Sequence, residues 1–525
     1  MRTVTKQIDA YISRMHSYLN QNLILVTTLL LIIIAAYGFE LFNLNLTIDE
    51  EVHAFSPQAD RWIEQGRWGM YLLNRFLLPQ PVIPFVPLFT ALTFHLIAIL
   101  LLLNSWEVES KLEKLMIGAI GMSYPGMAYM YTFSTINFGI GVGLFLVALA
   151  LFVYVRTGGG YKYFAVLPAA ISISIYQGFA VALAVAFLVH FISVEIRSER
   201  RNVNIKNLLT ISFIGMLSAA TYYAIQKLFL WITATNIGYV DTFFDINYLR
   251  ENFSDVTRHV LGTLLRVYSG SPFIYGSEIS ILAVIVILAF SSLAIRLIYC
   301  KQSIANKIFI ASLCLLLLVL PFASGFFMRG TLAMRFLVGL PIAFAGLVML
   351  GLHGRSRGMK LFTGVIVGFC VFQFVISTNT LFSSSGLALQ ADRLLAGRVL
   401  ERIADAKAIA GAKELKYLEV VGFIERAPTR LIPKSETFGA SFFEWDQGNT
   451  NRVLLFLRTL GYQELQALPV KGRSEIMDLT NAMPTWPDKG SVQVFGDAVV
   501  VKFGPYSYVQ NRTICEAVKN PKYCN

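Results

Sequence analysis

Residues 23–51 read LILVTTLLLIIIAAYGFELFNLNLTIDEE, a long apolar block that runs directly into three adjacent carboxylates. A helix of about 20 apolar residues crosses the hydrocarbon core of a bilayer, and comparable blocks occur at 82–103 and 361–375. The chain has 525 residues, of which 55% are hydrophobic and 14% charged, with a mean hydropathy of +0.60. Soluble domains carry about 25% charged residues. The sequence therefore predicts a membrane protein whose first apolar block is a retained helix and not a cleaved signal peptide.

The apolar blocks predict a polytopic α-helical membrane protein with about eleven transmembrane helices. The segment 162–195 could be a re-entrant pair that does not fully span, and this would leave the orientation of the later helices unchanged. We expect spans near 22–42, 82–104, 115–133, 137–155, 162–177, 179–195, 208–235, 279–299, 308–327, 336–353 and 361–380.

The distribution of basic residues predicts a cytoplasmic N-terminus. In that orientation the inner segments carry 17 Lys and Arg in 71 residues, and the outer loops carry eight in 97. Such an excess is typical of cytoplasmic loops. The net charge of +12 is therefore explained by membrane orientation, and no nucleic-acid partner is expected.

The chain divides into a transmembrane domain, 1–380, and a tail, 381–525, which this topology places on the outer side of the membrane. The transmembrane domain has a first external loop at 43–81 and a long external loop at 236–278. The tail is long enough for its own core, and its pattern predicts a soluble α/β domain. We expect helices at 390–409 and 453–460, a strand at 415–421 and a strand pair within 491–503 that turns at Gly496-Asp497. Cys515 and Cys524 are close enough to form a disulfide there.

The acidic cluster Asp49-Glu50-Glu51 is the strongest candidate for chemistry. A solvated acidic cap is the simpler interpretation of three such residues. The segment 56–78 argues against it, because Trp and other apolar residues alternate with Arg in the pattern of one amphipathic helix lying at the membrane surface. Such a helix would hold the cluster at a fixed depth, where a carboxylate meets a substrate whose lipid tail stays in the bilayer.

Arg329 and Arg335 lie in a short, mostly apolar connection. Arg at membrane depth usually has a partner, and guanidinium pairs with phosphate through two parallel hydrogen bonds. A lipid-phosphate substrate and ordinary lipid headgroups both fit this pattern. Asp241 and Asp245 stand among aromatic residues in the long external loop, which suits sugar binding but also any ordered loop.

Several other patterns carry no chemistry. Gly139-x-Gly141-x-Gly143 lies inside an apolar helix and predicts close helix packing. The chain has no Asp-x-Asp and no histidines at metal-ligand spacing, so neither a metal site nor a cofactor is expected.

Three motifs carry a resemblance to a known family. They are Asp49-Glu50 after the first helix, Gln65-Gly66-Arg67-Trp68, and the tail segment Met483-Pro484-x-Trp486-Pro487-x-x-Gly490-Ser491-Val492. The chain resembles GT-C glycosyltransferases, and more specifically the serotype-converting O-antigen glucosyltransferases of the Gtr type II family. The resemblance implies transfer of glucose from undecaprenyl-phosphate-glucose to a lipid-linked O-antigen unit of lipopolysaccharide, on the periplasmic face of the bacterial inner membrane.

The resemblance and the residue chemistry together suggest a division of roles. Asp49 is the expected general base, with Glu50 as the second choice. One base and one displacement predict inversion at the anomeric carbon, and a departing lipid phosphate needs no metal. The remaining candidates are Arg67, Arg329 and Arg335 for the donor phosphate, and Trp68, Glu51, Asp241 and Asp245 for the sugar or acceptor. Trp68 could equally serve only to anchor its helix.

Other functions remain open at this point. An O-antigen polymerase or ligase would also work on lipid-linked sugars, but it would rely on external Arg residues without the Asp49 cluster. A transporter or flippase predicts polar residues within the helices, where this chain has few. A non-catalytic assembly protein would depend on the tail.

Overall fold

The computed structural model describes residues 22–55, 60–78, 83–198, 203–236, 246–299, 302–328, 332–352, 356–462 and 464–518. The chain forms two compact units. We call them the helical unit, residues 1–43 and 59–379, and the C-terminal unit, residues 44–58 and 380–525. Residues 44–58, which the sequence pattern assigns to the first external loop, thus belong with the tail.

The helical unit has the apolar helices expected of a membrane protein. Within the described residues, eight helices of the chain are long and apolar enough to cross a bilayer. They are α2 (Leu23–Phe42), α6 (Val86–Ser105), α9 (Asn137–Arg156), α11 (Phe179–Arg197), α12 (Ile205–Thr233), α16 (Ile281–Tyr299), α17 (Ile304–Val319) with η3 (Leu320–Phe322), and α20 (Arg357–Ile409).

The predicted number of eleven spans is not confirmed, because three of them correspond to shorter helices. These are α7 (Lys111–Ser123), α10 (Val166–Ile175) and α19 (Leu340–Leu352). Pro125 explains the end of α7, since the residue before a proline disfavours the helical conformation. The 3₁₀ helix η2 (Gly159–Ala165) replaces the first turns expected of the span that contains α10.

Short helices complete the helical unit. They are α4 (Arg61–Glu64), α5 (Trp68–Phe76), η1 (Pro125–Met127), α8 (Ala128–Tyr131), α13 (Ile246–Glu251), α14 (Phe253–Tyr268), α15 (Pro272–Tyr275), α18 (Ser324–Phe327) and η4 (Met334–Phe336). The single amphipathic helix predicted over 56–78 was wrong in this respect: α4 and α5 are separate. Gly66, at φ +74°, adopts the left-handed conformation that ends α4 and turns the chain.

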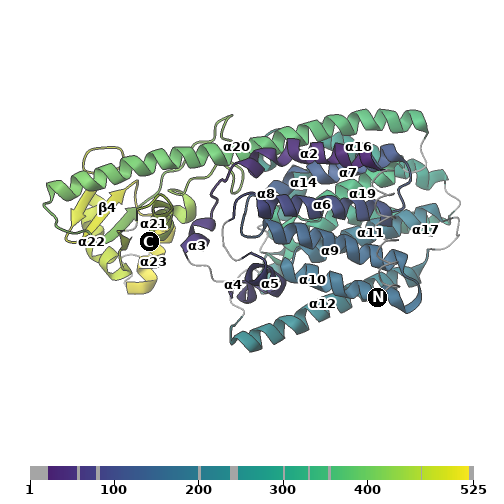
Figure 1. Ribbon diagram of the computed structural model, residues 1–525, viewed down its shortest axis with the longest axis horizontal. Helices are drawn as coiled ribbons and strands as arrows, with labels where there is room; N and C mark the ends of the chain where they lie inside the picture. The colour runs from purple at the N-terminus through teal and green to yellow at the C-terminus, as the bar shows by residue number, and fades with distance from the viewer. Residues whose placement is uncertain are drawn as a thin grey trace, which may run out of the picture. The chain divides into compact units, whose positions relative to one another are not determined.

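Close helix packing explains the glycine motif of α9. In Figure 1, α6 and α9 lie side by side near the middle of the helical unit. A Cβ atom added to Gly141 would stand 2.4 Å from the backbone of Ala91 on α6, and one added to Gly143 would stand 2.0 Å from the Phe179 ring. The prediction that these glycines permit close packing is confirmed.

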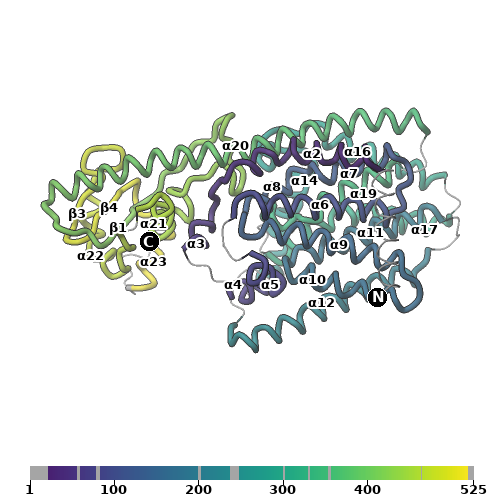
Figure 2. Tube along the Cα trace, viewed as in Figure 1, coloured from purple at the N-terminus to yellow at the C-terminus, as the bar shows by residue number. Residues whose placement is uncertain are grey.

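The C-terminal unit contains a four-stranded sheet in the order β2-β1-β4-β3. Figure 2 labels three of these strands, β1, β4 and β3. β1 (Tyr417–Val421) pairs in parallel with β2 (Gln466–Ala467) and with β4 (Ala498–Lys502). β3 (Val492–Phe495) pairs with β4 in an antiparallel hairpin, and Gly496 turns it at φ +63°. The helices are α3 (Glu50–Phe55), α21 (Thr450–Thr459), α22 (Val470–Ala482) and α23 (Tyr508–Val518), with the 3₁₀ helix η5 (Trp445–Gln447).

The sheet of this unit has apolar cores on both faces. On one face, Val399 of α20 and Phe456 of α21 pack with Val499 and Val501 of β4. On the other face, Val500 packs with residues of α22, α23 and the loops beside them. This follows from the alternation of side chains along a strand, and it makes the unit a three-layer arrangement of helices around a sheet.

α20 differs from its prediction, because the expected span 361–380 and the expected helix 390–409 form one continuous helix. The intervening Ser-rich residues favour a break only weakly. Phe382 is fully buried beside the Phe438 ring, and the Ser384 hydroxyl donates to the Pro433 carbonyl at 2.7 Å. These tertiary contacts outweigh the local preference.

Glu419 on β1 is a buried carboxylate whose titration affects stability. It lies 2.9 Å from Arg473 Nε and accepts a 3.3 Å hydrogen bond from the Thr450 hydroxyl. Burial raises the pKa of Glu419 to about 7, and Arg473 offsets the rise only in part. Because the folded unit holds this proton more tightly than the unfolded chain, stability is greatest below the unfolded value near 4.5 and falls as the pH rises through 7.

We expect amide protection of β1 and β4 to fall between pH 4.5 and 7 in the intact protein, after correction for intrinsic exchange rates. The free energy of unfolding can fall by at most about 1.4 kcal/mol per pH unit for one titrating group. In Glu419→Gln the amide protection should change less with pH than in wild type. Glu464→Gln, at an exposed position of the same unit, should show the same pH dependence as wild type. Protection that rises with pH in wild type would contradict the assignment. Hydrogen exchange followed by mass spectrometry measures it.

Candidate active site

The acidic segment Asp49-Glu50-Glu51 opens helix α3 in the C-terminal unit. Glu50 is fully buried, and its carboxylate accepts a hydrogen bond from the Thr47 backbone N–H at 2.9 Å. The sequence Thr47-Ile48-Asp49-Glu50 thus forms part of a capping box, in which the glutamate satisfies a backbone donor before the helix. Glu50 therefore fixes the start of α3, and this geometry favours Asp49 over Glu50 as the base.

Of the three adjacent carboxylates, the one that is exposed belongs to Asp49. Its backbone is at φ +77°, a left-handed conformation that Asp tolerates better than most residues. The side chain is 56% exposed, and one carboxylate oxygen accepts a 3.0 Å hydrogen bond from Arg452 of α21. Asp49 is thus oriented by one cation and still open to solvent.

Glu51 is the buried partner of the same arginine. Arg452 Nη1 donates to Glu51 Oε1 at 2.6 Å, and the carboxylate is fully buried. Burial raises the pKa of Glu51, while the charge of Arg452 and its hydrogen bond counteract the rise. Glu51 Oε2 is buried with no hydrogen-bond partner among the described residues. A buried carboxylate oxygen without a hydrogen-bond partner is unusual in a folded protein.

A third carboxylate completes the set around Arg452. Asp446, just before α21 and at φ +49°, accepts from Arg452 Nε. We call Asp49, Glu51, Asp446 and Arg452 the carboxylate cluster. With three acids around one cation its formal charge is negative when all are ionised. Such a cluster repels a phosphate and suits proton acceptance or hydrogen bonding to sugar hydroxyls.

The motif Gln65-Gly66-Arg67-Trp68 forms the turn between α4 and α5 in the helical unit. The side chain of Gln177, between α10 and α11, donates to the Gln65 carbonyl at 2.7 Å and accepts from Arg67 Nε at 3.3 Å. The hydroxyl of Tyr222 on α12 donates to the Gly66 carbonyl at 2.8 Å. The turn is therefore fixed against α12 and against the connection between α10 and α11 in its own unit.

Arg67 and Arg335 each lie near one ring of a stacked pair. The Arg67 guanidinium lies 4.8 Å from the Tyr176 ring centroid, and the Arg335 guanidinium lies 5.8 Å from that of Phe336. Tyr176 and Phe336 stack with centroids 5.9 Å apart and an interplanar angle of 18°. We call these four residues the arginine–aromatic array. It links two predicted phosphate ligands, far apart in sequence, through the ring pair Tyr176–Phe336.

Trp68 is buried and packs inside the helical unit. Its ring stacks on Phe229 of α12 with a centroid distance of 5.7 Å and an interplanar angle of 6°. Its indole N–H lies 3.4 Å from the Tyr222 carbonyl. Of the two roles considered for Trp68, this geometry favours anchoring of α5.

Four candidates lie outside the described residues: Arg329, Asp241, Asp245 and Cys524. Their roles, and the disulfide between Cys515 and Cys524, stay predictions. Sequence reasoning missed Arg452 and the ring pair Tyr176–Phe336. Only Tyr176 had a signal, because the break at Tyr176-Gln177-Gly178 ends a short helix; nothing near Arg452 in the sequence points to Glu51.

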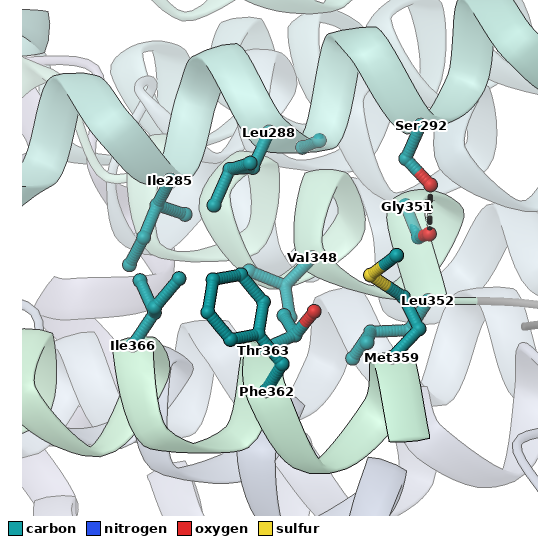
Figure 3. Close-up of a pocket in the computed structure, with 11 residues that line it drawn as sticks. Ile285, Leu288, Ser292, Val348, Gly351, Leu352, Met359, Phe362, Thr363 and Ile366 are labelled. Carbon is teal, nitrogen blue, oxygen red and sulfur yellow. Dashed lines mark hydrogen bonds between the residues drawn. The ribbon is translucent and has the colours of Figure 1, made fainter. Parts of the chain in front are cut away.

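A small cavity of about 60 Å³ lies between α16, α19 and α20 (Figure 3). Ile285, Val348 and Phe362 line it, and the Ser292 hydroxyl donates to the Gly351 carbonyl at its edge. Its size and apolar lining exclude a sugar site. In the described part of the chain, no group of three or more His, Cys, Asp or Glu residues is arranged to hold a metal ion.

The long apolar helices are those expected of a membrane protein. The family model "Glucosyl transferase GtrII" matches residues 38–352, more than half of the chain, and the chain belongs to this family. The protein is thus a glycosyltransferase of O-antigen modification, which implies a sugar donor and a lipid-linked acceptor.

The matched region includes both Asp49-Glu50 and the Gln65–Trp68 turn. The tail motif around Trp486 lies outside it. In the structure this motif is part of the tail's own packing: the Trp486 ring contacts Phe503 at a centroid distance of 5.9 Å, and its backbone N–H donates to the Lys502 carbonyl. No curated protein and no solved structure matches the chain.

Proposed function

We propose that the protein transfers glucose from undecaprenyl-phosphate-glucose to a lipid-linked O-antigen unit on the periplasmic face of the bacterial inner membrane. The observation that carries the proposal is Asp49, a half-exposed carboxylate oriented by Arg452 in a chain of the GtrII family. The excess of Lys and Arg in the inner segments supports a cytoplasmic N-terminus and a periplasmic C-terminal unit.

In the proposed reaction Asp49 removes the proton from the acceptor hydroxyl. The hydroxyl oxygen forms a bond to the anomeric carbon of glucose, and the bond from that carbon to the phosphate oxygen breaks. The electron pair leaves with undecaprenyl phosphate, and Asp49 later passes its proton to water. A single displacement inverts the anomeric centre. A base of this kind contributes roughly 10²–10⁴-fold.

The leaving phosphate is assigned to Arg67 and Arg335, with Arg329 as a third ligand. The array supports this assignment because ring contacts hold Arg67 and Arg335, so little side-chain entropy is lost on binding. Guanidinium groups stabilise charge that develops on phosphate oxygens, and the proposed reaction therefore proceeds without a metal. Glu51, Asp241 and Asp245 are proposed to contact the acceptor or sugar.

We expect Arg67→Ala and Arg335→Ala to lower glucose transfer by roughly 10²–10³-fold, the usual effect of removing one donor to a developing anion. Arg67→Lys should recover little, because an ammonium cannot reproduce the planar stacking on Tyr176. Membranes are incubated with labelled undecaprenyl-phosphate-glucose, and label is followed into O-antigen. Arg258→Ala, whose side chain on α14 is 79% exposed, is the matched control.

The same assay separates the competing functions. Labelled lipid that crosses the membrane without any glucosylated product would support a flippase and contradict the transferase. Joining of O-antigen units without glucose addition would support a polymerase or ligase. Wild-type rates in both arginine variants would remove the array from the donor site.

A further inference from the structure

A second, larger cavity of the helical unit lies along α10, α11, α12 and α17 and is open to the surface of the unit, where Ser212, Gly215 and Ala219 are exposed. Its volume is about 340 Å³. Small side chains create the space: Ala169 of α10, Ala184 of α11, and Gly215 and Ala219 of α12 all line it. A Cβ atom added to Gly215 would have no neighbour within 4 Å. α12 therefore leaves open space at Gly215.

The cavity is chemically a site for hydrocarbon. Its lining consists of apolar side chains apart from Ser212 and Ser218. The Ser218 hydroxyl donates to the Ile214 carbonyl of its own helix at 2.7 Å, so its proton does not need an acceptor on a ligand. An open apolar groove along membrane-spanning helices is suited to hydrocarbon chains.

The cavity is elongated along the membrane-spanning direction. On α12 its lining runs from Leu208 to Ala219, which at 1.5 Å per residue covers about 16 Å. Residues of all four helices line the cavity, and the residue of α17 that lines it is Leu316. The shape suits a chain that lies parallel to the helices.

One end of the cavity adjoins the arginine–aromatic array. Ala180 lines the cavity, and Gln177, which holds Arg67, is three residues earlier on the chain. Ile173 lines it, and Tyr176 of the array is three residues later, at the end of α10. A ligand that fills the cavity and extends past α10 thus reaches a cationic site. Hydrocarbon joined to an anion is the chemistry of a phosphorylated lipid.

We infer that this cavity binds the isoprenoid chain of a polyprenyl phosphate whose phosphate lies at Arg67 and Arg335. The inference rests on the proposed function, which it extends by assigning the lipid carrier of the donor a site between α10, α11, α12 and α17. The apolar lining and the volume of about 340 Å³ suit an isoprenoid chain, and the array supplies charge complementarity for its phosphate.

Filling the cavity tests the inference. Gly215→Leu places a side chain in the space, and Ala184→Phe does so from α11 if the first variant fails to fold. We expect KM for undecaprenyl-phosphate-glucose to rise roughly tenfold, the effect of excluding two or so methylenes from a buried site. KM for a short-chain analogue of the donor should not change. Gly368→Leu, at another helical glycine with open space around it, is the matched control.

A binding measurement makes the test independent of transfer. Native mass spectrometry of the purified full chain with undecaprenyl phosphate should show retained lipid in wild type and much less in Gly215→Leu. Equal retention and equal KM in wild type and both cavity variants would overturn the inference, as would a retained phospholipid that undecaprenyl phosphate does not displace. Retention that depends on Gly215 without any glucose transfer would support the cavity and refute the proposed function.

Discussion

Asp49→Asn should lower the rate of glucose transfer by roughly 10²–10⁴-fold, because the amide cannot accept the proton of the acceptor hydroxyl. The fold should survive, since Asn tolerates the left-handed backbone of this position, at φ +77°, as well as Asp does. Binding of the donor should be unchanged. Initial rates of label transfer in membranes, with the donor concentration varied, give both quantities.

Asp446→Asn is a closely matched control for this change. Asp446 is also half-exposed, also at positive φ, and also pairs with Arg452. The two substitutions therefore remove the same charge from the same cluster, and only one removes the proposed base. Transfer near the wild-type rate in Asp49→Asn, or an equal loss in both variants, would show that Asp49 is not the base.

The long apolar helices were predictable because their signal is contained in one segment. The apolar composition of a block such as 23–42 is enough to predict a membrane-spanning helix, and the helix formed there is α2. The shorter elements depend on local breaks and on neighbours. α10 begins only after a 3₁₀ helix, and α20 continues through a Ser-rich segment because Phe382 is buried against the tail's own Phe438.

The candidate site was predictable only in part, for the same reason. An acidic run after a membrane helix identified Asp49, and a cation in an apolar connection identified Arg335. Their partners depend on tertiary structure: Glu51 and Arg452 are 401 residues apart, and Arg67 and Arg335 are linked through the rings of Tyr176 and Phe336. No periodicity in one sequence reports such pairs.

The pairing of Arg452 has a consequence for both stability and activity. Among the described residues, Arg452 is the one charged donor shown for the fully buried Glu51, to which its Nη1 donates. The Nη2 of Arg452 donates to Asp49 and orients it. We expect Arg452→Met to destabilise the C-terminal unit by about 3–5 kcal/mol, because it leaves a buried carboxylate without its counter-ion. Transfer should fall as well. Hydrogen exchange of α3 and α21 measures the first effect, and the membrane assay measures the second.

A double variant separates these two roles of Arg452. Replacing both partners of a buried ion pair by apolar residues is often neutral, so Glu51→Met with Arg452→Met should recover most of the protection of α3 and α21. Transfer should stay low, because Asp49 still lacks the hydrogen bond that orients it. Arg512→Ala, which breaks an exposed ion pair with Glu516 in the same unit, should change little. If the double variant regains transfer together with stability, Arg452 serves only to compensate Glu51, and Asp49 does not need it for orientation.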